Sequence, residues 1–269
     1  MSHYITVESG KSLKLKTAGK YCDRDIVVTA EGGSGMVVCE KTDRVSAQHI
    51  LALIENLKVV SLPNAQTINE VTFQNCKHLT RIDAPNVTSI GDGAFYECTS
   101  LTDIYMPTLW TVNLNAFKGC TSLRRIDFPS LKTVISGAFV GCVNLSEVNL
   151  PQLTLIDANA FANCSSLVKV DFPSVTDIGA DAFLNCTNLS TVILRTTVQP
   201  CIVDVTSFIN TKIMDENGMP TGQGFAYYPT SMDEAYRAVY EPAFAEMGMP
   251  GAFDYLFRKI EDYPEITGG

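Results

Sequence analysis

A pattern of apolar and polar positions repeats every 22 residues through the middle of the chain. Prolines, phenylalanines, cysteines and leucines each keep their own register in this pattern. The unit reads P-x-φ-T-x-I-x-x-x-A-F-x-x-C-x-x-L-x-x-φ-x-φ, where φ is apolar, and six copies span residues 63–194. Such a unit is too short to fold alone, so neighbouring copies are predicted to stack as a solenoid with one shared core. The inward phenylalanines and cysteines are Phe73, Phe95, Phe117, Phe139, Phe161 and Phe183, with Cys76, Cys98, Cys120, Cys142, Cys164 and Cys186.

Each coil is predicted to contain one short strand and one helical turn. Ile82, Asp83 and Ala84 alternate inward and outward before a proline, which lacks a backbone donor and suits the end of a strand. Stacked coils would therefore form a parallel sheet on one wall. Ala94, Phe95 and Cys98 have the spacing of one α-helical or 3₁₀ turn that faces the core, and Ile90 and its equivalents form a second inward column.

Segments on the N-terminal side of the repeats are predicted to cap the solenoid. Residues 1–31 read as a small β module with strands at 4–7, 13–15 and 25–30, and residues 32–35, Gly-Gly-Ser-Gly, as a flexible linker. Residues 36–58 form the N-terminal cap, in which residues 46–56 keep the spacing of an amphipathic helix. The repeat domain itself is assigned to residues 59–194.

The C-terminal side is predicted to begin with a degenerate repeat, residues 195–229. Ser207-Phe208-Ile209-Asn210-Thr211 matches A-F-x-x-C after a three-residue insertion, and Met214 takes the leucine slot. A long loop at 215–224 precedes a strand at 226–228. Residues 230–269 form a helical cap with helices at 233–246 and 252–261, the first opened by a capping box formed by Ser231 and Glu234.

Composition and charge narrow the function classes. The chain has 269 residues, of which 46% are hydrophobic and 18% charged, which excludes a disordered protein. The chain has a formal charge of -9, so it lacks the positive charge that attracts the phosphates of DNA or RNA, and nucleic-acid binding is not expected. The sequence contains no run of about eighteen apolar residues, so no membrane insertion is expected. The N-terminus lacks the basic and apolar regions of a signal peptide.

The in-register cysteines are interpreted as buried thiols that act as small hydrophobic residues. One thiol per coil cannot supply the converging ligands of a zinc site. Disulfides between coils about 4.8 Å apart would require parallel side chains to reorient. Cys22, Cys39 and Cys201 lie off the period and are expected to be the more reactive ones.

Outward positions of the strands are the candidate binding surface. The charges of one column alternate in sign, which predicts a ladder of ion pairs that neutralise one another. This structural interpretation is favoured over a charged-ligand site. Exposed ion pairs of this kind contribute about 0–1 kcal/mol each. Its members are Arg81, Asp103, Arg125, Glu147 and Lys169.

The adjacent outward column contains Asp83, Tyr105, Asp127, Asn149 and Asp171. Carboxylates beside an aromatic ring suit a sugar or a cationic group, and Tyr105 with Trp110 forms the best local aromatic pair. Calcium is disfavoured because aspartates two coils apart are about 9.6 Å from one another. A solvated polar face is the default interpretation of this column.

Enzyme motifs are missing from the sequence. The three histidines are scattered, and no G-x-S-x-G, H-E-x-x-H or phosphate-binding loop occurs. We therefore expect a non-catalytic protein with no cofactor and no metal.

Two of the repeat copies, VTSIGDGAFYECTSLTDIYMP and VTDIGADAFLNCTNLSTVILR, resemble the BspA-like leucine-rich repeats, whose hallmark is I-G-x-x-A-F-x-x-C-x-x-L before a φ-x-φ-P strand. The resemblance covers residues 57–194. This chain departs from the family in a period one residue shorter and in replacing I-G by Val112-Asn113, Val134-Ile135 and Ile156-Asp157. The resemblance implies an α/β solenoid, a right-handed leucine-rich-repeat superhelix, and a role in adhesion or surface interaction.

Segments outside the repeats are similar to other protein classes. The ending YYPTSMDEAYRAVY resembles one common in gut-bacterial and prophage repeat proteins, and SLKLKTAGKYCDRDIVVTA is similar to small modules of phage tail and fibre-like proteins. We therefore expect a virion or cell-surface protein that binds a protein or cell-surface glycan through the sheet face and the C-terminal loop, as a phage tail-associated receptor-binding protein. The alternatives are a bacterial surface adhesin and an intracellular interaction scaffold. An oligomer through the N-terminal module is a further expectation.

Overall fold

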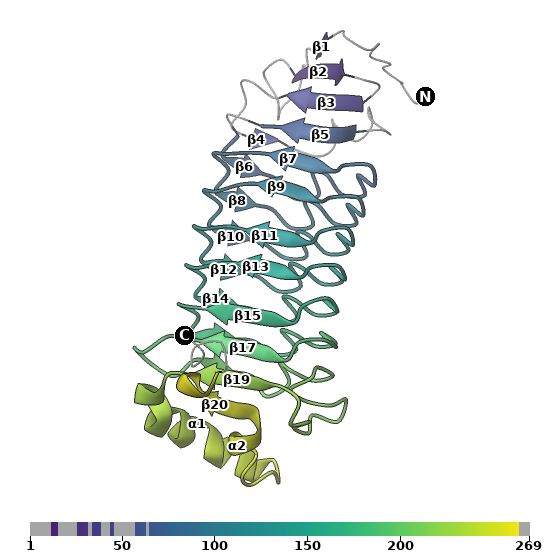
Figure 1. Cartoon of the computed structure of the whole chain (residues 1–269). Helices are drawn as coiled ribbons and strands as arrows, with labels where there is room; N and C mark the ends of the chain where they lie inside the picture. The colour runs from purple at the N-terminus through teal and green to yellow at the C-terminus, as the bar shows by residue number, and fades with distance from the viewer. Residues whose placement is uncertain are drawn as a thin grey trace.

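The computed structural model describes residues 57–62 and 65–263, together with the strands Ser12–Leu15, Ile26–Glu31, Ser34–Val38 and Arg44–Val45. The repeats form a column of stacked coils, and two helices close its C-terminal end (Figure 1). Equivalent strands of successive coils pair in parallel with a step of 22 residues, as Arg81 with Asp103 and Arg125 with Glu147. The predicted parallel-sheet solenoid is confirmed.

The main sheet lies on one wall of the column and contains one strand from each coil. It consists of three hydrogen-bonded segments, and the first includes strands that precede the repeats. The first segment contains β1 (Ser12–Leu15), β2 (Ile26–Glu31), β3 (Ser34–Val38), β5 (Leu57–Ser61), β7 (Arg81–Asp83) and β9 (Asp103–Tyr105). The others contain β11 (Arg125–Asp127) with β13 (Glu147–Asn149), and β15 (Lys169–Phe172), β17 (Thr191–Leu194), β19 (Phe225–Tyr228) and β20 (Phe257–Lys259).

A second parallel sheet follows the column of Ile90, where the sequence predicts an inward position but no strand. Each of its eight strands has two residues, and the second residue faces the core in each strand whose side chains are described. The strands are β4 (Arg44–Val45), β6 (Thr67–Ile68), β8 (Ser89–Ile90), β10 (Thr111–Val112), β12 (Thr133–Val134), β14 (Leu155–Ile156), β16 (Asp177–Ile178) and β18 (Ile202–Val203).

The A-F-x-x-C stretch forms tight turns, and the predicted α-helical or 3₁₀ turn is absent from the repeats of the described chain. Its amides alternate in direction: Tyr96 N–H donates within the coil to Gly93 O at 3.0 Å, whereas Phe95 N–H donates to Ala116 O of the next coil at 2.7 Å. A helix would keep all of these bonds within the coil. The alternation requires left-handed residues in two slots, and φ is 58° at both Gly93 and Glu97.

The core consists of columns that run the length of the repeats. The phenylalanine rings stack with centroid separations of 5.0 to 5.9 Å from Phe73 to Phe208, so the degenerate repeat continues the column. All six phenylalanines of the regular repeats are at most 1% exposed. Offset aromatic pairs at this spacing contribute about 0.5–1.5 kcal/mol beyond the burial of their area.

The strands before the repeats extend the main sheet. β2 and β3 form an antiparallel hairpin in which Glu31 pairs with Ser34, and β3 pairs in parallel with β5. The prediction of a flexible linker at 32–35 is therefore wrong for Ser34 and Gly35, which belong to β3. The predicted strand at 4–7, the helix at 46–56 and the cysteines Cys22 and Cys39 lie outside the described residues.

The C-terminal cap contains one long helix, α1 (Asp233–Glu246), after a short 3₁₀ turn, Thr230–Met232. The predicted capping box is wrong, because Met232 takes the N-cap position and makes no side-chain cap bond. Helix α1 begins instead with Asp233 and Glu234, whose negative charges favour the positive end of the helix dipole.

The predicted second helix at 252–261 is interrupted after one turn. Helix α2 spans only Phe253–Leu256, and the chain then continues as β20 and a 3₁₀ turn, Ile260–Asp262. β20 pairs in parallel with β19, so this segment satisfies the peptide groups at the end of the main sheet. No helix in the described part of the chain is long and apolar enough to cross a membrane.

Candidate binding face

The outward side of the main sheet presents two columns of side chains, as the repeat register predicts. We define the open face as the eight outward residues of β7, β9, β11 and β13. Several project far into solvent: the side chains of Arg81 and Arg125 are 56% and 59% exposed, and that of Glu147 is 68% exposed. The residues of the open face are Arg81, Asp83, Asp103, Tyr105, Arg125, Asp127, Glu147 and Asn149.

Ion pairs on the open face run along strands as well as across them. Arg125 lies 3.1 Å from Asp127 on its own strand and 3.7 Å from Glu147 on the next. Arg81 lies 3.8 Å from Asp83, and no ion pair joins it to Asp103 in the described chain, although the two are register partners. The predicted ladder between coils is therefore formed only in part. Exposed pairs of this kind contribute about 0–1 kcal/mol each.

Tyr105 lies at the centre of the open face. It is 54% exposed, and its register partner in the preceding coil is Asp83, while Asp127 takes the same slot in the following coil. Among the described residues its ring contacts neither an aromatic side chain nor a cation. Trp110 directly precedes β10 of the second sheet and makes no ring contact with Tyr105, so the predicted aromatic pair is not formed.

The last coils of the same sheet are covered by the chain itself. Residues 260–263, which we call the C-terminal strap, pack over Ile193 and Tyr227, which are 0% and 8% exposed although they occupy outward slots. Tyr263 meets the Tyr227 ring edge-on, with a centroid separation of 5.0 Å.

Two of the ten candidate residues lie beside this covered end. The Lys169 amine lies 4.6 Å from the centroid of the Tyr263 ring. Asp171 accepts two hydrogen bonds from the Arg195 guanidinium at 2.8 and 2.7 Å. The sequence interpretation did not include Arg195 or Tyr263. Eight candidates thus lie together on the open face, whereas Lys169 and Asp171 contact Tyr263 and Arg195 of the chain itself.

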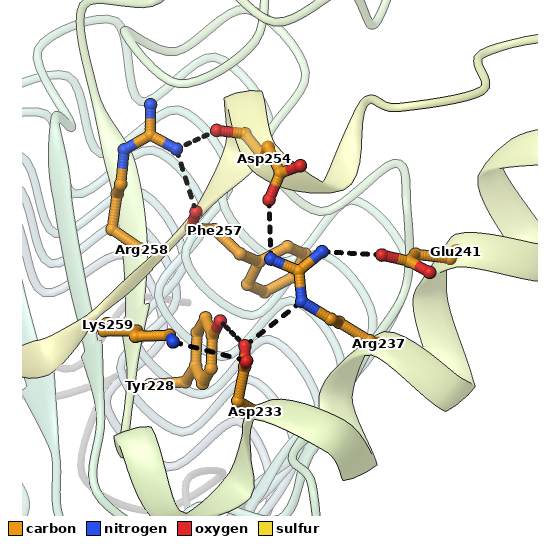
Figure 2. A network of polar contacts seen from close by, with 8 residues as sticks. All are labelled: Tyr228, Asp233, Arg237, Glu241, Asp254, Phe257, Arg258 and Lys259. Carbon is orange, nitrogen blue, oxygen red and sulfur yellow. Dashed lines mark hydrogen bonds and ion pairs between the residues drawn. The ribbon is translucent and has the colours of Figure 1, made fainter.

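A charged network holds the C-terminal cap together, as Figure 2 shows. Asp233 accepts a hydrogen bond from the Tyr228 hydroxyl at 2.5 Å and pairs with Arg237 and Lys259, both at 3.3 Å. The Tyr228 hydrogen bond is the main cause of a lowered pKa at Asp233. Arg237 also pairs with Glu241 and with Asp254 of α2, at 2.6 and 2.8 Å. These contacts join α1, α2 and β20, so we assign the network a structural role.

The cysteine column is buried. The thiols of Cys98 to Cys186 donate to the phenylalanine carbonyl of the preceding coil, with sulfur to oxygen distances of 3.0 to 3.2 Å. Burial raises the pKa of Cys76 and Cys142 to about 12. Within the described residues no group of histidine, cysteine and acidic side chains could hold a metal ion.

Cys201 corrects the expectation that off-period cysteines are reactive. It is 0% exposed, and burial raises the pKa of its thiol far above the ordinary value. Helix α1 covers it: the Cys201 amide donates to the Tyr236 hydroxyl at 3.0 Å, and its carbonyl accepts from the Tyr240 hydroxyl at 2.6 Å. A buried thiol is a poor nucleophile, because the thiolate is the reactive form.

The C-terminal loop at 215–224 lies apart from the open face. It leads into β19, so β15 and β17 separate it from β13. The loop closes on Asp215, whose carboxylate accepts from the amides of Asn217 and Met219 at 2.8 and 2.9 Å. The structure does not bring this loop and the open face into one site.

Comparison with known proteins places the repeats in a family. A model of the BspA type leucine-rich repeat region matches in six copies, over residues 49–152 and 88–214. The chain belongs to this family. The I-G pair of BspA-type repeats has a clear physical basis here, because a Cβ at Gly91 or Gly179 would lie 2.4 or 2.8 Å from a backbone nitrogen of the preceding coil.

One solved structure shows the same fold, and a second is similar over most of the chain. A leucine-rich cell surface protein of Faecalibacterium prausnitzii is 21% identical with a TM-score of 0.53, covering 83% of this chain and 72% of its own. A leucine-rich repeat protein of Bacteroides ovatus is 18% identical with a TM-score of 0.44, covering 80% and 71%. No protein with a curated description matches this chain.

Proposed function

We propose that this BspA-type repeat protein is a non-catalytic binding protein that holds a protein or glycan partner on its open face. The observation that carries the proposal is Tyr105, an exposed tyrosine that is surrounded by charged side chains and whose ring contacts no aromatic ring or cation among the described residues. Tyrosine and arginine are enriched among residues that dominate binding energy at interfaces. Outward slots beneath the strap hold Ile193 and Tyr227, whereas those of the open face remain polar and solvent-exposed.

Adhesion at a surface is the setting we propose for this binding. The solved relative from Faecalibacterium prausnitzii is described as a cell surface protein. Of the two surface roles expected from the sequence, this relative favours a bacterial surface adhesin, whereas the similarity of the N-terminal segment to phage tail modules favours a tail-associated receptor-binding protein. Neighbouring genes separate the two roles: tail, holin or endolysin genes support the phage role, and secretion or anchoring genes support the adhesin.

Binding of the labelled protein to intact bacterial cells tests the open face. The test variant carries Tyr105→Ala, Arg125→Ala and Asp127→Ala, which truncate the centre of the face without changing net charge. The control variant carries Glu70→Ala, Lys77→Ala and Tyr255→Ala, which truncate three exposed residues outside the open face with the same net charge. We expect the test variant to lose roughly tenfold or more in affinity and the control to bind as the unaltered protein does. Equal binding by all three proteins would overturn the proposal.

A further inference from the structure

The open face carries more negative than positive charge. It contains two arginines and four carboxylates, Asp83, Asp103, Asp127 and Glu147, so its formal charge is 2 − 4 = −2. The whole chain has a formal charge of -9. Complementary charge across an interface steers encounter and selects partners, so this surface favours a positively charged partner over a negatively charged one.

Local contacts engage the arginines of the open face but leave part of the carboxylate surface available. Arg125 already lies between Asp127 and Glu147, and Arg81 lies beside Asp83. Asp103 accepts only the Thr102 hydroxyl, at 2.8 Å, among the described residues. The arginines of this face are therefore engaged. Asp127 also accepts from the Asn149 amide at 2.8 Å, but a carboxylate oxygen can accept more than one hydrogen bond, so acceptor capacity remains on both strands next to Tyr105.

Elsewhere on the main sheet the chain places cations over aromatic rings. The Arg258 guanidinium lies 4.5 Å from the centroid of Phe225, and the Lys169 amine lies 4.6 Å from that of Tyr263. Tyr105 offers an exposed ring with an aspartate in the same slot of each neighbouring coil, and no cation lies over it in the described part of the chain. A cation over such a ring is stabilised by the electron-rich ring face and by the carboxylates beside it.

We propose that the open face binds a basic segment of a protein partner, with one lysine or arginine side chain over Tyr105 between Asp83 and Asp127. This inference rests on the proposed function and specifies the partner. A sugar could stack on Tyr105, but a neutral sugar has no use for the surplus of negative charge. A glycan partner is therefore an outcome that the experiment must distinguish.

Fluorescence anisotropy with a labelled ten-residue lysine peptide tests the proposal, with a ten-residue glutamate peptide and a neutral dextran oligosaccharide as the other probes. We expect the lysine peptide alone to bind, and more weakly as salt rises from about 0.01 M to about 0.15 M. The double variant Asp83→Asn/Asp127→Asn should weaken binding about tenfold. Tyr105→Ala should weaken it by a similar factor, and Tyr105→Phe, which keeps the ring, should retain it.

A charge-matched control separates a site from general attraction to an acidic protein. Glu70→Gln/Asp92→Asn removes two exposed charges away from the main sheet and should change binding less than about twofold. Equal weakening by both double variants would overturn the inference, as would tighter binding of dextran or of the glutamate peptide.

The cell-binding assay separates failure of this inference from failure of the proposed function. Excess lysine peptide should displace the protein from cells, and Asp83→Asn/Asp127→Asn should reduce cell binding. If the open-face triple variant loses cell binding while the double variant and the peptide have no effect, the face binds a partner that is not basic and only this inference falls. If the triple variant binds normally, the proposed function falls as well.

Discussion

The hydroxyl oxygen of Tyr240 on α1 lies 2.6 Å from the backbone nitrogen of Val203 on β18, the last strand of the second sheet. The same hydroxyl donates to the Cys201 carbonyl at 2.6 Å. In the preceding coil the carbonyl equivalent to that of Cys201 belongs to Thr176, and it accepts from the Ile202 amide of β18. Helix α1 therefore ends the ladder with side chains instead of another coil. An exposed strand edge invites pairing with another chain, and this hydroxyl closes the edge within the molecule.

Tyr240→Phe should destabilise the protein, because it leaves a buried amide and a buried carbonyl without this partner. We expect the free energy of unfolding to fall by about 1–3 kcal/mol in chemical denaturation. Tyr255→Phe is the control, since Tyr255 is 62% exposed and its hydroxyl has no hydrogen-bond partner among the described residues. Equal stability of the two variants would show that the hydroxyl does not terminate the sheet.

Val71→Asn should stabilise the protein. Val71 has a φ of 47°, in a slot where other coils have Gly93, Asn115 and Asn159. The left-handed conformation costs an ordinary L-residue about 1–2 kcal/mol, and asparagine tolerates it better than a β-branched residue. Val71 is 40% exposed, so little burial is lost. Thermal unfolding should show a higher midpoint, and a lower midpoint would contradict this account of the turn.

Asp233→Asn should weaken the C-terminal cap in a pH-dependent way. The Tyr228 hydroxyl and the nearby cations lower the pKa of Asp233 below its ordinary value of 3.8. The carboxylate thus contributes stability above pH 3.8, and this contribution is lost as pH falls through the lowered pKa. We expect the variant to be less stable by about 1–2 kcal/mol at pH 7 and the difference to shrink in acid. A difference that stays constant down to pH 2 would contradict the proposed charge network.

The cysteine column should make the protein sensitive to alkali. Burial raises the pKa of Cys142 from 9.0 to about 12. A raised pKa stabilises the folded state below pH 9, and this stability is lost between pH 9 and about 12 because only the unfolded chain releases the proton. The stability advantage of the wild type over Cys142→Ala should therefore fall by roughly 1.4 kcal/mol per pH unit in this window.

Thr211→Ala provides the control for this titration. Thr211 takes the cysteine slot in the last coil, where its hydroxyl donates to the Phe208 carbonyl at 2.7 Å. Threonine does not titrate in this window, so the effect of Thr211→Ala should not change between pH 9 and 12. If the stability differences caused by Cys142→Ala and by Thr211→Ala change with pH in the same way, thiol ionisation is not the cause of the alkali sensitivity.

The solenoid could be predicted because each inward slot keeps its residue type from coil to coil, as at Phe95 and Cys98. The second sheet could not be predicted in the same way, because strands of two residues are too short to show alternation. The spacing of Ala94, Phe95 and Cys98 is helical, so it predicts a helical turn where the structure has tight turns. The glycines and asparagines in the left-handed slots, such as Gly93 and Asn115, were the signal that the helix interpretation did not use.

The candidate face was predicted in its residues but not in its extent. Register alone placed Arg81, Tyr105 and Arg125 on one surface. Coverage of the last coils depends on how residues 260–263 fold back, which no local pattern determines. A signal was nevertheless present at Ile193, which is apolar in a slot where the earlier coils have serine, aspartate, asparagine or an exposed tyrosine.

Photocrosslinking on intact cells tests the central claim most directly. Benzoylphenylalanine is placed at position 105 or at position 255, which hold tyrosines of similar exposure, 54% and 62%, on the open face and on the C-terminal cap. After irradiation of the bound protein, we expect a discrete adduct from position 105, lost on competition with unlabelled protein, and none from position 255. An adduct from position 255 with none from position 105 would contradict binding through the open face.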